Sequence, residues 1–329
     1  MANLKEIIEK LLENLSSRQK EIIEERFGLK GRKLTLAAIG KKYGLTRERI
    51  RQIEAVVLKL IKKELEKSEA RKIIEKSLLR LKKIGGVRKE ENFINDLKIL
   101  LKDNGVDYRQ IRFIFEVAGN PRFHRNDKNF YNFWHLDEDS FKRAVDLINK
   151  LEKFFSGKKE KLLAASYGFK NPSEQNYVSI SKKFRTNPFG QFGLTKWEEI
   201  HPKTMRSKAY LIIKKHKSPL HFREITKKIN EAKFNGRSAF EATVHNELIK
   251  DPRFVLVGRG MYGLAELGHQ PGIAKEVIQR ILKNKGPLRK EEVVNLVKQE
   301  RFLKDNTILL NLQNKKHFKK LPDGRYHLA

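Results

Sequence analysis

Cysteine is absent from this 329-residue sequence. Without thiols the chain cannot form a disulfide framework or a thiolate zinc site, and nothing argues for an oxidising compartment. Long apolar runs are missing too, because no segment approaches the roughly 18 apolar residues that a membrane span needs. The opening stretch, MANLKEIIEKLLENL, lacks the uninterrupted apolar core of a signal peptide and predicts an amphipathic helix. We therefore expect a cytoplasmic protein with no membrane contact.

Acidic residues are few relative to basic ones. Lysine and arginine number 72 against 40 aspartates and glutamates, which gives a formal charge of +32. The excess is spread along the chain, because residues 1–80 carry 21 basic and 12 acidic groups, residues 81–200 carry 23 and 16, and residues 201–329 carry 28 and 12. Such a charge favours a polyanionic partner, with nucleic acid ahead of an acidic membrane surface.

Signatures of catalysis and metal binding are also missing. The nine histidines are scattered, with no H-E-x-x-H motif or carboxylate array, and His124 and His135 fall within one predicted hairpin. The Gly258–Gly260 turn lacks the strand-to-helix context of a phosphate loop, and Asp137–Asp139 is better explained by helix capping. We predict a non-enzymatic protein with no catalytic, cofactor-binding or metal-binding residues, and no small-molecule ligand is indicated.

Apolar spacing predicts two helices joined by a short turn between residues 36 and 60. Leu36, Ile39 and Tyr43 recur at helical steps, Gly44 supplies the turn, and Thr46 is suited to cap the second helix. The apolar stripe of that helix is Ile50, Ile53, Val57 and Leu60. This arrangement is typical of a helix-turn-helix unit, whose second helix enters the major groove of DNA.

The front of the second helix is polar. The candidate DNA contacts are Thr46, Arg47, Glu48, Arg49, Arg51 and Gln52. Arginine can pair with guanine through two hydrogen bonds, glutamine can pair with adenine, and glutamate can accept from cytosine. A solvated charged face is the alternative, but the glycine turn and the threonine cap favour DNA reading. Lys41 and Lys42, just before the turn, are candidate phosphate contacts.

The segment from Leu15 to Lys63 closely resembles domain (region) four of the primary sigma factors of bacterial RNA polymerase. The resemblance rests on RFGL and on the uninterrupted IGKKYGLTRERIRQIEA. It implies that the recognition helix reads a −35 promoter element and that the domain docks on the flap of the polymerase beta subunit. Nothing after this segment resembles the sigma domains that grip the polymerase clamp and melt the promoter, so a conventional stand-alone sigma factor is not expected.

A fourfold repeat occupies the remainder. An aromatic residue, seven residues, a second aromatic, one residue and an apolar residue recur at separations of 61, 70 and 64 residues. The four sets are Phe123/Tyr131/Phe133, Phe184/Phe192/Leu194, Phe254/Tyr262/Leu264 and Phe318/Tyr326/Leu328. Each set predicts a terminal β-hairpin, and we expect its rings to form the core face of the hairpin rather than to stack on bases.

Amphipathic helices precede the hairpins, and two or three helices followed by a hairpin make a winged helix. The predicted fold class is mainly α with small β-hairpins, as an N-terminal helix-turn-helix domain followed by a tandem array of about four winged-helix domains. The expected ranges are 1–65 for the helix-turn-helix domain, 66–80 for a helical connector, and 81–140, 141–200, 204–268 and 272–329 for the winged helices, of which the second is the most divergent.

The third copy, residues 204–268, is similar to the HARE-HTH winged-helix family, which bacterial polymerase delta subunits, some restriction enzymes and chromatin proteins share. The resemblance rests on SPLHFREI and on RSAFEATVHNELIKDPRFVLVGRGMYGL. It implies association with nucleic acid or polymerase without fixing the residues responsible. Lys227, Lys228, Arg237 and Arg259 are candidate phosphate contacts here, and a solvated surface is the alternative.

These features predict a sequence-specific double-stranded-DNA-binding transcription factor. It would be sigma-like, recognise a short −35-like promoter element and make further DNA or protein contacts through its winged helices. One alternative is an accessory protein that docks on the beta flap of the RNA polymerase core, and another is a DNA-specificity subunit of a restriction or modification system. The expected location is the bacterial cytoplasm, in association with the nucleoid.

Overall fold

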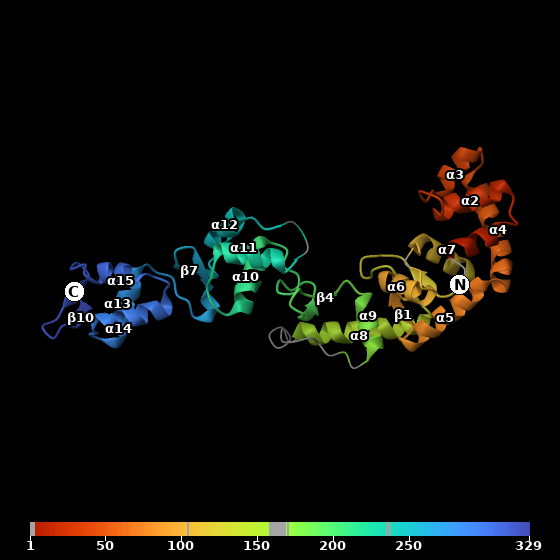
Figure 1. The fold of residues 1–329 in the computed structure, drawn as a ribbon. Coiled ribbons are helices and arrows are strands. Elements are labelled where there is room, and N and C mark those ends of the chain that lie inside the picture. Colours follow the sequence, from red (N-terminus) through yellow and green to blue (C-terminus); the bar gives the residue numbers. More distant parts are fainter. Residues whose placement is uncertain (1–3, 104, 158–168, 170, 235, 237) are drawn as a thin grey trace. The chain divides into compact units, whose positions relative to one another are not determined.

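The computed structural model of the chain describes residues 4–103, 105–157, 169, 171–234, 236 and 238–329 (Figure 1). The chain divides into two compact units, Met1–Arg185 with Phe192–Thr195, and Thr186–Gln191 with Lys196–Ala329. Helices predominate, and the strands form small antiparallel sheets, so the predicted fold class is confirmed. The six expected domain ranges stay a prediction. Among the described helices, none combines the length and the apolarity needed to cross a membrane.

The chain begins with four helices, α1 (Leu4–Leu11), α2 (Ser17–Phe27), α3 (Leu36–Tyr43) and α4 (Arg47–Lys67). Helix α2 starts at a capping box, because the Gln19 backbone N–H donates to the Ser16 hydroxyl at 3.3 Å and the Ser16 N–H donates to the Gln19 side chain at 3.1 Å. Ile22, Ile39 and Ile50 come one each from α2, α3 and α4 and are fully buried. This small core holds the helix-turn-helix together.

Helix α4 is 21 residues long and serves two cores. Its front half contributes Ile50 to the small core, and its rear half contributes Val57, Ile61 and Leu65 to a larger one. The predicted stripe was wrong at Leu60, which is 45% exposed, whereas Ile61 is fully buried. Four-residue steps from Val57 keep the apolar face inward, and a three-residue step leaves it.

The first winged helix consists of α5 (Glu69–Lys83), β1 (Val87–Lys89), α6 (Glu90–Leu101), α7 (Tyr108–Ala118), β2 (Arg122–His124) and β3 (Phe133–His135). Strand β3 lies between β1 and β2, antiparallel to both. Phe123 is opposite Trp134 in the sheet, not opposite Phe133 as the repeat predicts. Phe133 is buried on the other face, and Tyr131 lies outside the strand and is 37% exposed. The predicted core face is therefore wrong at these two residues, because a slip of one position reverses the faces.

The second copy contains α8 (Glu138–Gly157), α9 (Pro172–Ser179), β4 (Phe184–Thr186) and β5 (Phe192–Leu194). The Asp137 carboxylate accepts from the Ser140 N–H at 2.7 Å in the first turn of α8, so the capping interpretation of this acidic stretch is confirmed. Phe184 and Phe192 stack with their centroids 5.5 Å apart, and both rings are buried. The predicted core face is confirmed for this hairpin.

The third copy contains α10 (Met205–His216), β6 (Leu220–His221), α11 (Phe222–Glu231), α12 (Glu241–Lys250), β7 (Phe254–Gly258), β8 (Met261–Leu264) and a 3-10 turn η1 (Ala265–Leu267). In its sheet, of order β6-β8-β7, Phe254 is opposite Leu264 and Tyr262 is opposite Leu256. The three repeat residues Phe254, Tyr262 and Leu264 are buried, as predicted. Ser238 does not cap α12, which begins after Phe240 without a side-chain cap.

The fourth copy contains α13 (Ala274–Lys285), α14 (Lys290–Glu300), α15 (Asp305–Leu312), β9 (Phe318–Lys320) and β10 (Tyr326–Leu328). Phe318 is opposite Leu328 and buried, and Tyr326 and Leu328 are half-buried against the same core. The loop after α14 covers the free edge of β7, because the Phe302 N–H donates to the Val257 carbonyl at 2.8 Å. The hairpin of the third copy is therefore held by the fourth.

Candidate DNA-binding site

The start of α4 is fixed by a tight turn. Gly44 adopts φ 63°, and the N–H groups of Gly44 and Leu45 both donate to the Gly40 carbonyl. A Cβ atom on Gly40 would lie 2.6 Å from the Leu45 carbonyl oxygen, so the turn requires glycine there. The Thr46 hydroxyl accepts from the Arg49 N–H at 3.1 Å, which confirms the predicted cap.

The polar front of α4 lies in solvent, and its side chains pair with one another. The exposed residues are Thr46, Arg47, Glu48, Arg49, Arg51 and Gln52. Arg51 donates to both Glu48 carboxylate oxygens, with the shortest distance 2.7 Å, and Arg49 donates to the Gln52 side-chain oxygen at 3.1 Å. The Arg51 hydrogen bond holds the pKa of the Glu48 carboxyl below its ordinary value. Exposed pairs of this kind contribute little to stability, so these groups can exchange partners for base edges at small cost.

Three cations flank the turn. Lys41 is exposed and has no partner within the described part of the chain, whereas Lys42 forms an ion pair with Glu25. Arg18, on α2, donates to the Tyr43 carbonyl at 3.2 Å and stays exposed beside the end of α3. Sequence reasoning missed Arg18, because only the fold brings α2 against the turn. Of the two predicted lysines, Lys41 is the better placed to meet a phosphate.

The rear of this domain is covered by α7, the third helix of the first winged helix. The buried residues of α7 are Ile111, Phe113, Ile114, Phe115 and Val117. The Phe113 ring packs edge-to-face on Phe27 with centroids 5.1 Å apart, and Arg109 donates to the Gly31 carbonyl at 2.8 Å. The first winged helix therefore supports α4 from behind and leaves its polar front in solvent.

Residues 11–63 match the family model for Sigma-70, region 4. Residues 203–267 match the HARE-HTH family model, a helix-turn-helix domain named partly for ASXL and restriction endonuclease. Over 60 residues the chain is 48% identical to the RNA polymerase sigma factor SigA of Bacillus sp.. That stretch is 18% of this chain and 16% of the relative, so the chain matches only a small part of that sigma factor.

Both matches confirm the resemblances predicted from sequence. Both families are DNA-binding domains, and together they indicate a DNA-binding, sigma-like regulator with a link to RNA polymerase. The polar front of α4 lies within the region-4-like domain, and α12 with its hairpin lies within the HARE-HTH-like domain. The fourth winged helix lies outside both matched segments.

The candidate phosphate contacts on α11 face nearby carboxylates. The Lys227 ammonium lies 3.8 Å from Glu231 and that of Lys228 lies 3.6 Å from Glu224, one helical turn away in each case. Arg237 lies outside the described residues. The charge of both lysines is thus partly offset within their own helix.

Arg259 is exposed at the turn between β7 and β8. The glycines beside it are explained by packing. A Cβ atom on Gly258 would lie 2.7 Å from the Phe302 carbonyl oxygen, and one on Gly260 would lie 2.6 Å from the His221 ring. The turn is therefore held on both sides, and Arg259 stays a candidate phosphate contact.

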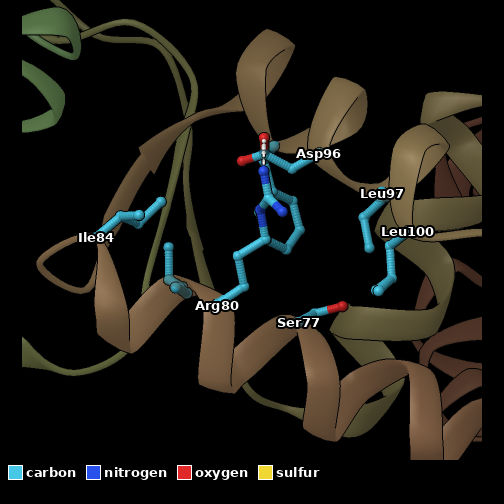
Figure 2. A pocket seen from close by; sticks show the side chains of 8 residues that line it. Ser77, Arg80, Ile84, Asp96, Leu97 and Leu100 are labelled. Carbon is cyan, nitrogen blue, oxygen red and sulfur yellow. Dashed lines mark hydrogen bonds and ion pairs between the residues drawn. The ribbon is translucent and has the colours of Figure 1, made fainter. Parts of the chain in front are cut away.

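A buried carboxylate ties the first winged helix to α9. Asp96 accepts from Arg80 at 3.0 Å, a contact that Figure 2 shows, and from Arg88 at 2.9 Å. Arg88 also donates to the Asn176 side chain on α9, and the Asn176 amide donates to the Ile84 carbonyl at 3.1 Å. The cavity beside Asp96 measures about 10 Å³, which is room for no more than a single water molecule. This network is a structural tie.

Two histidines of the first hairpin have local partners. His124 lies 2.8 Å from the Asp127 carboxylate, and His135 lies 3.1 Å from the Asp137 carbonyl oxygen. Among the residues that the structure describes, no cluster of three or more histidines and carboxylates is arranged to hold a metal ion.

Proposed function

We propose that this protein is a sequence-specific double-stranded-DNA-binding transcription factor whose helix α4 reads a short −35-like promoter element. The observation that carries the proposal is the exposed polar front of α4, which the Thr46 cap and the Gly44 turn hold in place. The likeness of this segment to a sigma factor supports a promoter as the target.

Each residue of the front has a role in this proposal. Glu48, Arg51 and Gln52 lie three and four positions apart, so they share one side of the first turns and enter the major groove together. Arg51 pairs with guanine, Gln52 with adenine and Glu48 with cytosine. The phosphates on either side are met by Arg49 and by Lys41.

The test is selection of binding sites from a random DNA pool with the full chain. Wild-type protein should enrich one short element, and the Arg51→Ala/Gln52→Ala variant should lose that preference by about tenfold or more while it retains non-specific binding. The control is Lys63→Ala, which removes one positive charge from the exposed rear of the same helix. Unchanged preference in the double variant would sink the assignment.

The similarity to a named polymerase subunit also supports a second candidate function. The region-4-like domain would dock on the beta flap of the RNA polymerase core, and its DNA contact would be secondary. Because α7 already covers the rear of α2 and α4, such docking needs another surface of the domain. Co-purification with core polymerase in DNA-free, high-salt buffer favours this function, whereas binding of free protein to a promoter fragment favours the first.

A further inference from the structure

The four winged helices differ in whether the third helix is free to meet a partner. In the first copy, α7 is buried against the region-4-like domain. In the second copy, α9 has Asn176, Tyr177 and Val178 buried, and the Tyr177 hydroxyl donates to the Gly85 carbonyl at 2.8 Å, just before β1. Both helices are therefore occupied by contacts within their own unit.

The third copy leaves α12 accessible, but its surface suits a polyanion poorly. Its two glutamates are in ion pairs with arginines of α10 and α11: Glu247 with Arg206 at 2.8 Å, and Glu241 with Arg223 at 3.2 Å. Large exposed side chains at its two ends are apolar, since Phe240 is 71% and Ile249 is 64% exposed. Residues 241–264 contain three basic and three acidic groups. The helix and hairpin of this copy thus carry no net charge.

Helix α15 of the fourth copy has a different surface. Its buried side is formed by Ile308 and Leu312. The opposite side, continued past the end of the helix, exposes Asn306, Thr307, Leu310, Gln313 and Asn314. These positions recur at three- and four-residue steps and so form one face, on which Leu310 is 70% exposed. The helix contains no glutamate, and its single aspartate, Asp305, is paired with Lys298 at 2.8 Å.

Unpaired lysines surround this face. They are Lys304 before the helix, Lys315 and Lys316 after it, and Lys319 and Lys320 on β9. All five are exposed, and none has a carboxylate within ion-pair distance in the part of the chain that the structure describes. Residues 305–328 contain five basic and two acidic groups, and the second acidic group, Asp323, is paired with Arg325 at 2.6 Å.

We propose that the fourth winged helix is a second DNA-binding module of this protein. Helix α15, near the carboxyl end of the chain in Figure 1, enters the major groove, and the β9–β10 hairpin meets the phosphates beside it. The proposal depends neither on promoter reading by α4 nor on the HARE-HTH match, because the fourth copy lies outside both matched segments.

The chemistry of the face selects the partner. The Asn306 amide can form two hydrogen bonds with adenine, and Leu310 offers an apolar contact to the thymine methyl group. The lysines neutralise phosphates and release counterions. A projecting helix fits the wide major groove of duplex DNA, whereas the major groove of duplex RNA is too narrow to admit it. Duplex DNA is thus the polyanion that this surface fits.

The test measures affinity of the full chain for a short random-sequence duplex across a range of salt concentrations. The variant Lys319→Ala/Lys320→Ala should bind more weakly, and the slope of log affinity against log salt should fall by about 2 because two phosphate contacts are lost. The matched control is Lys283→Ala/Lys285→Ala, which removes the same charge from exposed positions at the end of α13. Equal changes in the two variants, or no change in the first, would overturn the proposal.

A second pair of variants tests the helix face itself. Asn306→Ala/Thr307→Ala/Leu310→Ala should weaken duplex binding, whereas Thr243→Ala/Asn246→Ala/Ile249→Ala on exposed positions of α12 should not. All six side chains are exposed, so unchanged thermal unfolding should accompany both variants. Equal loss of affinity in the two variants contradicts the proposal.

Two further arms separate this proposal from its alternatives. The effect of Lys319→Ala/Lys320→Ala should persist when Arg51→Ala/Gln52→Ala is also present, so failure of promoter reading by α4 leaves this result readable. Single-stranded RNA is the competitor for the other class of nucleic acid. RNA that competes better than the DNA duplex would overturn the assignment to DNA.

Discussion

A single glycine determines where α4 begins to face solvent. Gly40 accepts two backbone hydrogen bonds from the turn, and its missing side chain lets the Leu45 carbonyl approach. We predict that Gly40→Ala lowers the free energy of unfolding by about 1–3 kcal/mol, because the added methyl group forces the turn away from α3. Chemical denaturation monitored by circular dichroism measures this change, and DNA affinity should fall with it.

Gly31→Ala is the matched control for that substitution. Gly31 lies in the loop between α2 and α3, and a Cβ atom there would have no neighbour within 4 Å. The same added methyl group should therefore leave unfolding and DNA affinity close to wild type. If both alanine variants unfold alike, the close approach at Gly40 does not determine the turn.

At the scale of elements, α4 belongs to two cores, and this couples the region-4-like domain to the first winged helix. Phe113 of α7 is fully buried, and its ring lies against Phe27 of α2. We predict that Phe113→Ala lowers the free energy of unfolding by about 3–5 kcal/mol, because a large cavity opens between the two domains. Hydrogen exchange at the α3 and α4 amides should accelerate together with exchange in α7.

Tyr108→Ala is the control on the same helix, since Tyr108 is about half exposed at its start. This variant should leave exchange in α3 and α4 unchanged. Acceleration confined to α7 in the Phe113→Ala variant would show that the two domains are stable independently of each other.

Local chemistry explains which elements could be predicted from the sequence. The Gly44 turn and the Thr46 cap depend on residues within a few positions of each other, so their types alone indicate the start of α4. Burial of α7 could not be predicted in this way. Its apolar spacing shows that one face is covered, but Phe113 meets Phe27 across a separation that only the fold closes.

The hairpins show the same limit. The aromatic repeat predicted all four, because alternating apolar residues beside turn residues are a local signal. In the first hairpin, Phe133 and Trp134 are adjacent and both buried, so the sequence could not indicate which of them faces the core with Phe123. Pairing of charges is equally hidden. Lys227 and Lys319 look alike in sequence, but only Lys227 has a carboxylate nearby in the described structure.

At the scale of the whole molecule, the two proposed DNA-binding surfaces lie in different compact units of one chain. Helix α4 belongs to the first unit, and α15 belongs to the second. Joining two binding modules makes the second contact intramolecular, so the combined affinity can exceed either alone by about 10²-fold or more when both reach one duplex. The high positive charge of the chain adds to this effect in low salt.

The length of the DNA duplex therefore controls affinity. We predict that a long duplex carrying one selected promoter element binds at least about tenfold more tightly than a short duplex carrying the same element, because only the long one accommodates both surfaces. Fluorescence anisotropy with end-labelled duplexes measures the ratio. Lys319→Ala/Lys320→Ala should remove most of this advantage, and Lys283→Ala/Lys285→Ala should retain it. A ratio near one for the wild-type chain would mean that α4 and α15 do not act on the same DNA molecule.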